Sequence, residues 1–153
     1  MQDQNPDVTE LRRAAAQGDV EAHHQLALCY DQGLGVAQNF TEAFHWFQKA
    51  AERGHLEAAY QLGQSYSYGI YSPQDFDEGI KWYRQAADGG HADAQYMMGM
   101  SYLYGISVDP DDAEARRWYQ RAADQGHADS LEALQRLPAD KDDEDGFEIR
   151  EEV

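Results

Sequence analysis

The sequence has one cysteine and no apolar run long enough to cross a bilayer. Cys29 therefore has no partner for an internal disulfide, which fits a reducing compartment. The first residues, Met1 to Asp7, carry neither the basic region nor the apolar core of a secretion signal. We expect a cytoplasmic protein that does not enter a membrane.

Basic residues are scarce too. The chain has 12 Lys and Arg against 29 Asp and Glu, for a net charge of −17 over 153 residues. Nucleic-acid phosphates and anionic lipids repel such a chain, so we expect neither as a partner; a basic protein or peptide fits better. Solubility alone explains the charge equally well. The length suits one domain with a sizeable core.

What the chain does have is a fixed repeat. Large and small residues return every 36 positions with no insertion between them. The residues that keep this phase are Trp46, Trp82 and Trp118; Tyr30, Tyr66 and Tyr102; Gly18, Gly54, Gly90 and Gly126; and Gly33, Gly69 and Gly105. This period predicts a solenoid, whose units bury their apolar faces by stacking on one another.

Each repeat predicts two helices. In the first helix, Ala22, Leu26 and Cys29 lie on one side at helical spacing, and a glycine closes the helix. In the second helix, large rings alternate with Ala or Gly. The helix starts at an N-cap residue with Glu three positions on, a capping-box spacing in which the two side chains satisfy the backbone N–H groups at both positions. The first helices are expected over about Val20–Asp31, Leu56–Ser67 and Ala92–Leu103, and the N-cap pairs are Asn39 and Glu42, Asp75 and Glu78, and Asp111 and Glu114.

Partial units flank these three pairs. Asp7 and Glu10 have capping-box spacing before an expected helix over Val8–Gln17, and Ala128–Leu137 is a final helix ended by Pro138. We therefore predict eight helices in an all-α fold. The expected divisions are a loose arm at 1–6, a half-unit at 7–18, units at 19–54, 55–90 and 91–126, a terminal helix at 127–137, and an acidic tail at 138–153.

The repeated phrases resemble a known family. They read Trp82-Tyr83-Arg84-Gln85-Ala86-Ala87-x-x-Gly90-His91 and Leu62-Gly63-x-x-Tyr66-x-x-Gly69, and are similar to Sel1-like repeats, relatives of the tetratricopeptide repeat. The resemblance covers roughly residues 14–134. It implies a right-handed superhelix of antiparallel helix pairs, with a concave face lined by the first helices and used for binding proteins or peptides.

The chain departs from the family pattern in two respects. The loop Gly33-Leu34-Gly35-Val36 follows the pattern, but residues 69–72 and 105–108 lack the second glycine. We expect a different turn there, with Tyr71 exposed. Secreted family members carry paired cysteines in each unit. This chain does not, so the β-lactam binding proposed for those members does not transfer.

No residue set predicts catalysis, a cofactor or a metal. His55, His91 and His127 are equivalent positions of stacked units, about 10 Å apart, and are expected to be structural residues near helix starts. His23 and His24 are adjacent and point different ways. Cys29 shares its position in the repeat with Ser65 and Ser101 and has no evident base. We expect a protein that is not an enzyme.

A second side of the first helices offers a candidate binding groove. Tyrosine and methionine give large, adaptable contact areas, and aromatic residues are enriched at interface cores. Some of these rings have the alternative of packing between neighbouring units. The candidate residues are Tyr60, Gln64, Tyr68, Tyr96, Met100, Tyr104, His24 and Leu28.

The acidic tail is a second candidate. It has a net charge of −6, yet ends with the apolar residues Phe147, Ile149 and Val153. Its composition is that of a disordered segment. The alternatives are a solvated tail, a short recognition motif, and a strip that folds back onto the groove.

These features favour a non-enzymatic adaptor or scaffold that holds a protein or peptide in the concave face, with a monomer as the default state. The first alternative is an acidic inhibitor or immunity protein that neutralises a basic toxin or enzyme. A remote alternative is a carboxylate-dependent hydrolase.

Overall fold

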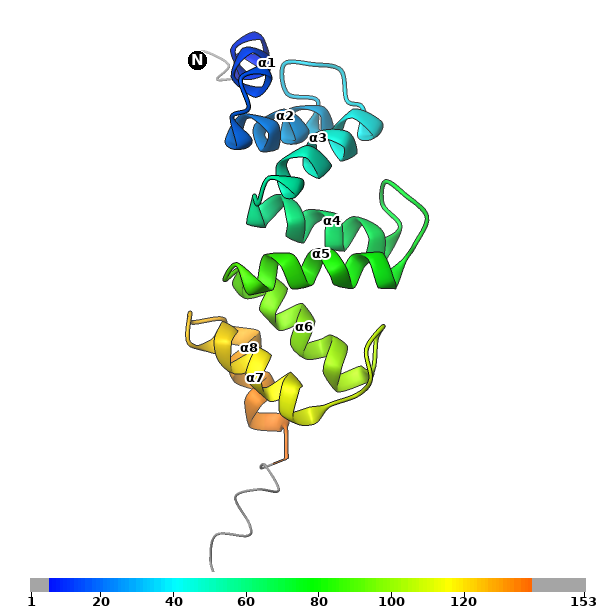
Figure 1. Ribbon diagram of the computed structural model, residues 1–153, viewed down its shortest axis with the longest axis vertical. Coiled ribbons are helices and arrows are strands. Elements are labelled where there is room, and N and C mark those ends of the chain that lie inside the picture. The colour runs from blue at the N-terminus through cyan, green and yellow to red at the C-terminus, as the bar shows by residue number, and fades with distance from the viewer. Residues whose placement is uncertain (1–5, 139–153) are drawn as a thin grey trace, which may run out of the picture.

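The computed structural model describes residues 6–138. Within this range the chain forms eight helices and no strand (Figure 1). The expected arm at 1–6, apart from Pro6, and the candidate tail motif of Phe147, Ile149 and Val153 lie outside the described residues. The helices are α1 (Val8–Ala16), α2 (Val20–Gln32), α3 (Phe40–Glu52), α4 (Leu56–Tyr68), α5 (Phe76–Asp88), α6 (Ala92–Tyr104), α7 (Asp112–Ala123) and α8 (Ala128–Arg136).

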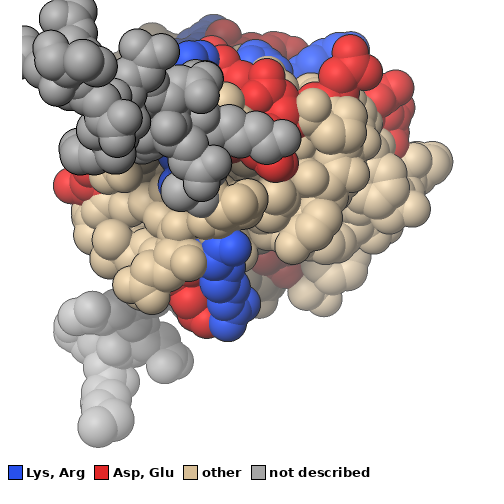
Figure 2. Space-filling view, turned by 90° about the horizontal axis from the view of Figure 1, so that it is seen from below, with Lys and Arg blue, Asp and Glu red and all other residues tan. Residues whose placement is uncertain are grey.

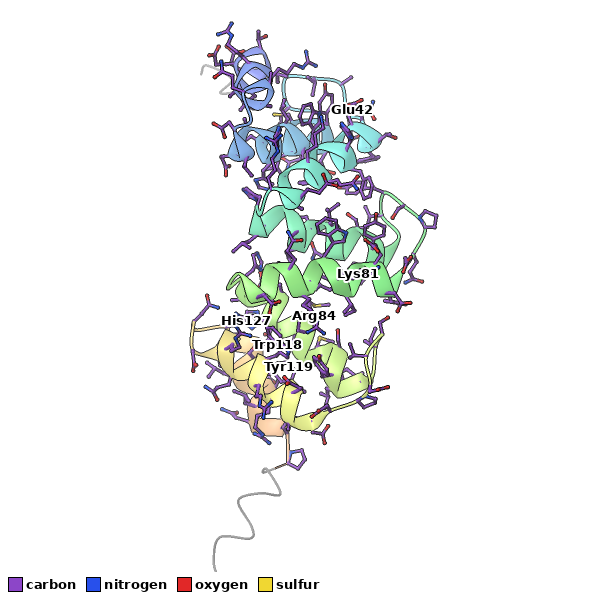
Figure 3. All side chains as sticks on the ribbon, in the orientation of Figure 1. Glu42, Lys81, Arg84, Trp118, Tyr119 and His127 are labelled. Carbon is purple, nitrogen blue, oxygen red and sulfur yellow. The ribbon has the colours of Figure 1, made fainter. Side chains whose placement is uncertain are left out.

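The helices stack in chain order. Each packs mainly on the helix before it and the helix after it, which gives an elongated array with α1 at one end and α8 near the other (Figure 1). Figure 3 shows Arg84 between α5 and α6, where it donates a hydrogen bond of 3.0 Å to the Tyr102 hydroxyl. The predicted all-α solenoid of helix pairs is confirmed.

The second helices begin at the predicted N-caps. The carboxylate or amide oxygen of Asn39, Asp75 and Asp111 accepts from the backbone N–H three residues on. The reciprocal half of the capping box was wrongly predicted. The backbone N–H of each cap residue donates instead to a tyrosine carbonyl in the preceding helix, so it does not need the glutamate. The acceptors are the carbonyl oxygens of Tyr30, Tyr66 and Tyr102.

The core follows the repeat. Phe47, Tyr83 and Tyr119 are equivalent rings of α3, α5 and α7, each at most 2% exposed. A Cβ added to Gly63 would lie 2.4 to 2.9 Å from three atoms of the Tyr83 ring, and Gly99 faces Tyr119 in the same way. Glycine at these positions lets the helices approach until the ring lies against the backbone.

The loop at residues 69–72 differs from the first loop as expected, but the expectation of a different turn at residues 105–108 is wrong. Gly35 has a φ of 71°, and Ser107, its equivalent two units on, keeps a left-handed φ of 55°. Tyr71 occupies the same position in the second unit without a positive φ. The prediction that Tyr71 is exposed is wrong. Its ring is half-buried 5.7 Å from the Phe40 ring, and its hydroxyl donates to Asp31.

Among the described helices, none has the length and hydropathy needed to span a bilayer.

Candidate binding face

We call the side of the array formed by α2, α4, α6 and α8 the groove face. One hollow on this face, here called the C-terminal cavity, has a volume of about 510 Å³ and lies between α6 and α8. Tyr119 of α7 contributes to its lining. The other lining residues are Tyr96, Met100, Leu103, Tyr104, Asp129, Glu132, Ala133, Arg136, Leu137 and Pro138.

Tyrosines give this cavity a large apolar wall. Tyr104 is 66% exposed, and Tyr68, its equivalent one unit earlier, is 63% exposed. Folding therefore leaves both rings accessible, although water contact is unfavourable for much of their surface. Met100 lies one helical turn from both Tyr96 and Tyr104 on α6. It is half-buried and lines the same cavity. Gln64 and Leu28 are also half-buried, and both line a second, smaller hollow.

The other predicted groove residues take part in packing between units, the alternative that the sequence left open. Tyr60 stacks on His91 with ring centroids 4.7 Å apart. Tyr96 lies 5.1 Å from the His127 ring and 5.5 Å from Tyr119. His24 is 7% exposed and stacks on His55 at 4.2 Å. These three rings hold successive units together, and only Tyr96 also lines the C-terminal cavity.

The histidines at 36-residue spacing have the structural role that the sequence predicts. His55, His91 and His127 are the N-caps of α4, α6 and α8, where Nδ1 accepts a backbone N–H. Because Nδ1 accepts, Nε2 of the neutral ring carries the proton, which it donates to a carboxylate of the preceding unit. The Nε2 to oxygen distances are 3.0 Å to Glu21, 2.8 Å to Glu57 and 2.9 Å to Asp93. Figure 3 labels His127, at the start of α8, in the C-terminal part of the array.

The smaller hollow, of about 180 Å³, lies between α2 and α4. Asp31 and Tyr71 close one side of it through their hydrogen bond. Burial and this bond to Asp31 raise the pKa of the Tyr71 hydroxyl, so it remains a donor at neutral pH. The lining is mainly polar, with Gln32, Gln61 and Gln64 among its residues.

Charge is unevenly placed around the C-terminal cavity. Asp129 and Glu132 lie on α8, and Arg136 pairs with Glu132. Figure 2 shows this end of the array, where uncharged side chains cover much of the visible surface between groups of charged residues. An apolar wall beside carboxylates suits a ligand with an apolar side chain next to a basic one.

Sequence reasoning missed the contribution of α8. Ala133 of α8 and Leu137, its C-cap residue, line the cavity, but the terminal helix was interpreted only as an end unit. The signal was available, since Ala133 and Leu137 are four residues apart and share one side of a helix.

Cys29 is buried, at 1% exposure, in the same position as Ser65 and Ser101. Burial raises the pKa of its thiol, which disfavours the nucleophilic thiolate.

Sequence reasoning also missed a group formed across two units. His23 and His24 do point different ways, as predicted: His23 Nε2 bonds to the Ala15 carbonyl, and His24 faces α4. There His24 meets His55 and Glu21, and one ligand atom of each of these three side chains lies within 4.8 Å of the others.

The fold and the groove face define an α-solenoid of stacked helix pairs. The family model for the Sel1 repeat matches residues 20–55, 56–91 and 92–127. The chain therefore belongs to the Sel1 repeat family. Proteins of this family generally mediate protein–protein interactions and are typically non-enzymatic scaffolds.

Solved structures agree with this assignment. The Sel1 repeat protein from Oxalobacter formigenes is similar at 39% identity and a TM-score of 0.82, over 84% of this chain and 97% of that one. A protective antigen of uropathogenic Escherichia coli, c5321, is 35% identical with a TM-score of 0.79, over 84% of this chain but 28% of its own length. Helicobacter pylori cysteine rich protein B, at 22% identity and a TM-score of 0.64 over 84% of this chain and 97% of that one, shares the fold. A comparison with curated proteins gave no match.

Proposed function

We propose that this protein is a non-enzymatic adaptor that holds a protein or peptide against its groove face, with the C-terminal cavity as the main recognition pocket. The observation that carries the proposal is the cavity of about 510 Å³, walled by Tyr96, Met100 and Tyr104 and open beside the 66% exposed Tyr104 ring. Aromatic and methionine side chains that are accessible in a hollow are the usual anchors of protein recognition.

The chemistry of the pocket favours one class of ligand. An apolar side chain of the partner would fill the space against Met100 and Leu103. A lysine or arginine next to it would reach Asp129 on α8, because Glu132 is already paired with Arg136. The overall charge of −17 would speed the approach of such a basic segment at low salt.

Affinity capture from the native extract, analysed by mass spectrometry, tests the proposal. The groove variant replaces Tyr68, Met100 and Tyr104 by Ala. The control variant replaces Phe76 by Ala, because Phe76 is 45% exposed at the start of α5, a helix that does not form the groove face. The groove variant should bind the captured partner at least about 30-fold more weakly, which is the effect of losing one strong anchor residue. The control variant should bind it with unchanged affinity.

Equal binding by the groove variant would contradict the proposal, provided that its helicity and melting are unchanged. A collapse of melting would show that the three side chains belong to the core. Repeating the capture with a chain that ends at Pro138, which keeps the lining of the cavity intact, tests the part played by the acidic tail.

The second candidate, an acidic inhibitor of a basic toxin or enzyme, is favoured by the net charge. It predicts one stoichiometric basic partner whose association rate falls steeply with salt. An adaptor held by the aromatic pocket predicts partners that survive high salt.

A further inference from the structure

Glu21, His24 and His55 form a cluster that joins two units of the array and that the proposed function does not use. His24 Nδ1 lies 3.9 Å from a Glu21 oxygen, and His55 Nε2 lies 3.0 Å from the other oxygen. Two imidazoles and one carboxylate are a common ligand set for zinc and related divalent transition metals. Among residues 6–138, these three residues form the one group of at least three His, Cys, Asp or Glu side chains whose ligand atoms lie close enough together to share an ion.

The orientation of His24 is the second observation. His24 is 7% exposed, and its Nδ1 atom is buried without a hydrogen-bond partner. Its Nε2 faces the Gln61 side-chain oxygen at 3.1 Å, so Nε2 carries the proton and Nδ1 presents a free lone pair beside Glu21. Outer hydrogen bonds of this kind fix the tautomer and the ring orientation of metal-binding histidines.

The repeat shows that this cluster is a local departure. The equivalent groups of the next two units are Glu57, Tyr60 and His91, and Asp93, Tyr96 and His127. Each keeps the carboxylate and the N-cap histidine but has a tyrosine in place of His24. Gln61 is equally local, because Met97 is its equivalent one unit on. His24 and the Gln61 amide that orients it therefore occur together in this cluster and in neither of the two equivalent clusters.

We propose that Glu21, His24 and His55 bind one divalent transition metal ion, with Zn²⁺ as the test ion. His24 Nδ1 and the Glu21 carboxylate are the prepared ligands. The His55 ring stacks on His24 at 4.2 Å and 27°, so it must turn out of the stack for its in-plane lone pair to reach the same ion. His55 Nε2 must first give up the proton that it donates to Glu21, and the neutral ring then carries its proton on Nδ1. This shift removes the N-cap bond from the Ala58 N–H, which is 3.1 Å long in the described state. Losing a cap costs about a factor of five in affinity.

The site remains open to solvent on one side. The Glu21 side chain is 61% exposed, whereas those of His24 and His55 are 9% and 17% exposed. Water or a side chain of a bound partner would complete the coordination.

Isothermal titration calorimetry of the full chain with Zn²⁺ tests the proposal, with Mg²⁺ as the comparison ion because it prefers oxygen ligands. One Zn²⁺ should bind, and thermal unfolding should shift upward by about 5 to 10 °C at a hundredfold excess over the Kd. Mg²⁺ should produce neither effect.

His24→Tyr is the decisive variant, because it converts the cluster to the arrangement of the next two units. It should keep the stack on His55 and the melting temperature of the metal-free chain, and weaken Zn²⁺ binding by at least about 100-fold, as expected for loss of a ligand. Glu21→Gln is the second variant and should weaken binding too. If His24→Tyr does not fold, Glu21→Gln decides the question alone.

Tyr60→His is the matched gain. It should create a second, weaker site with Glu57 and His91, because Met97 cannot orient the new imidazole. No zinc binding by the wild-type chain, or the same affinity in the folded variants that lose a ligand, would overturn the proposal.

Discussion

The N-cap histidines of the first helices hold the stack together, and His91 allows their contribution to be measured. Its Nδ1 accepts from the Ala94 N–H at 3.3 Å, its Nε2 donates to Glu57 at 2.8 Å, and its ring stacks on Tyr60 at 4.7 Å. One side chain thus begins α6 and joins it to α4. His91→Ala removes all three contacts, whereas His91→Asn keeps the cap alone, because asparagine is a strong N-cap.

The magnitudes follow from these contacts. The cap contributes about 1 kcal/mol, the stack about 0.5 to 1.5 kcal/mol, and the bond to the half-exposed Glu57 about 0.5 to 1 kcal/mol. His91→Ala should therefore lower the free energy of unfolding by about 2 to 3.5 kcal/mol, and His91→Asn by about 1 kcal/mol less.

Urea unfolding followed by circular dichroism measures both variants against the wild type. Equal losses in the two variants would show that the Nδ1 cap contributes nothing. Losses below about 0.5 kcal/mol in both would refute the reasoning, because they are typical of surface changes without structural contacts.

The remaining predictions concern the core. Gly63→Ala should lower the free energy of unfolding by about 1 to 2 kcal/mol, because overpacking against Tyr83 outweighs the gain in helix propensity. Urea unfolding measures this loss. A more stable variant would mean that the Tyr83 ring can move away from the added methyl group. Gly99→Ala should behave alike, since its Cβ would meet the Tyr119 ring. Cys29 should react with a thiol reagent such as DTNB only as the chain unfolds, because it is 1% exposed and burial raises the pKa of its thiol; fast reaction in native buffer would contradict its placement. Cys29→Ser should change stability by less than about 1 kcal/mol, given Ser65 and Ser101 in the same position.

Local features of the fold could be predicted from the sequence because their causes lie within a few residues. The side chains of Asn39, Asp75 and Asp111 bond to amides three positions away, so spacing alone identifies them. The partner of their own N–H is a carbonyl of the preceding helix, which spacing within one helix cannot reveal. This is why the reciprocal half of the capping box was wrongly assigned to the glutamates.

Contacts between units were harder to predict because they depend on the register of one unit against the next. Tyr71 is held by Asp31 and by the Phe40 ring of the preceding unit, so its loop sequence gave no sign of its burial. His24 and His55 come together for the same reason. Comparing histidines at equivalent positions could not reveal a pair at different positions. The exposed Tyr68 and Tyr104, by contrast, follow from the helical period, and their role in binding stays a prediction.

Amide hydrogen exchange of the protein alone and with its captured partner would test the groove-face proposal most directly. Binding at the C-terminal cavity should slow exchange in α6 and α8, with a smaller effect on α4, and leave α3 and α5 unchanged. Protection confined to α3, α5 and α7 would place the partner on the opposite side of the array and contradict the proposal.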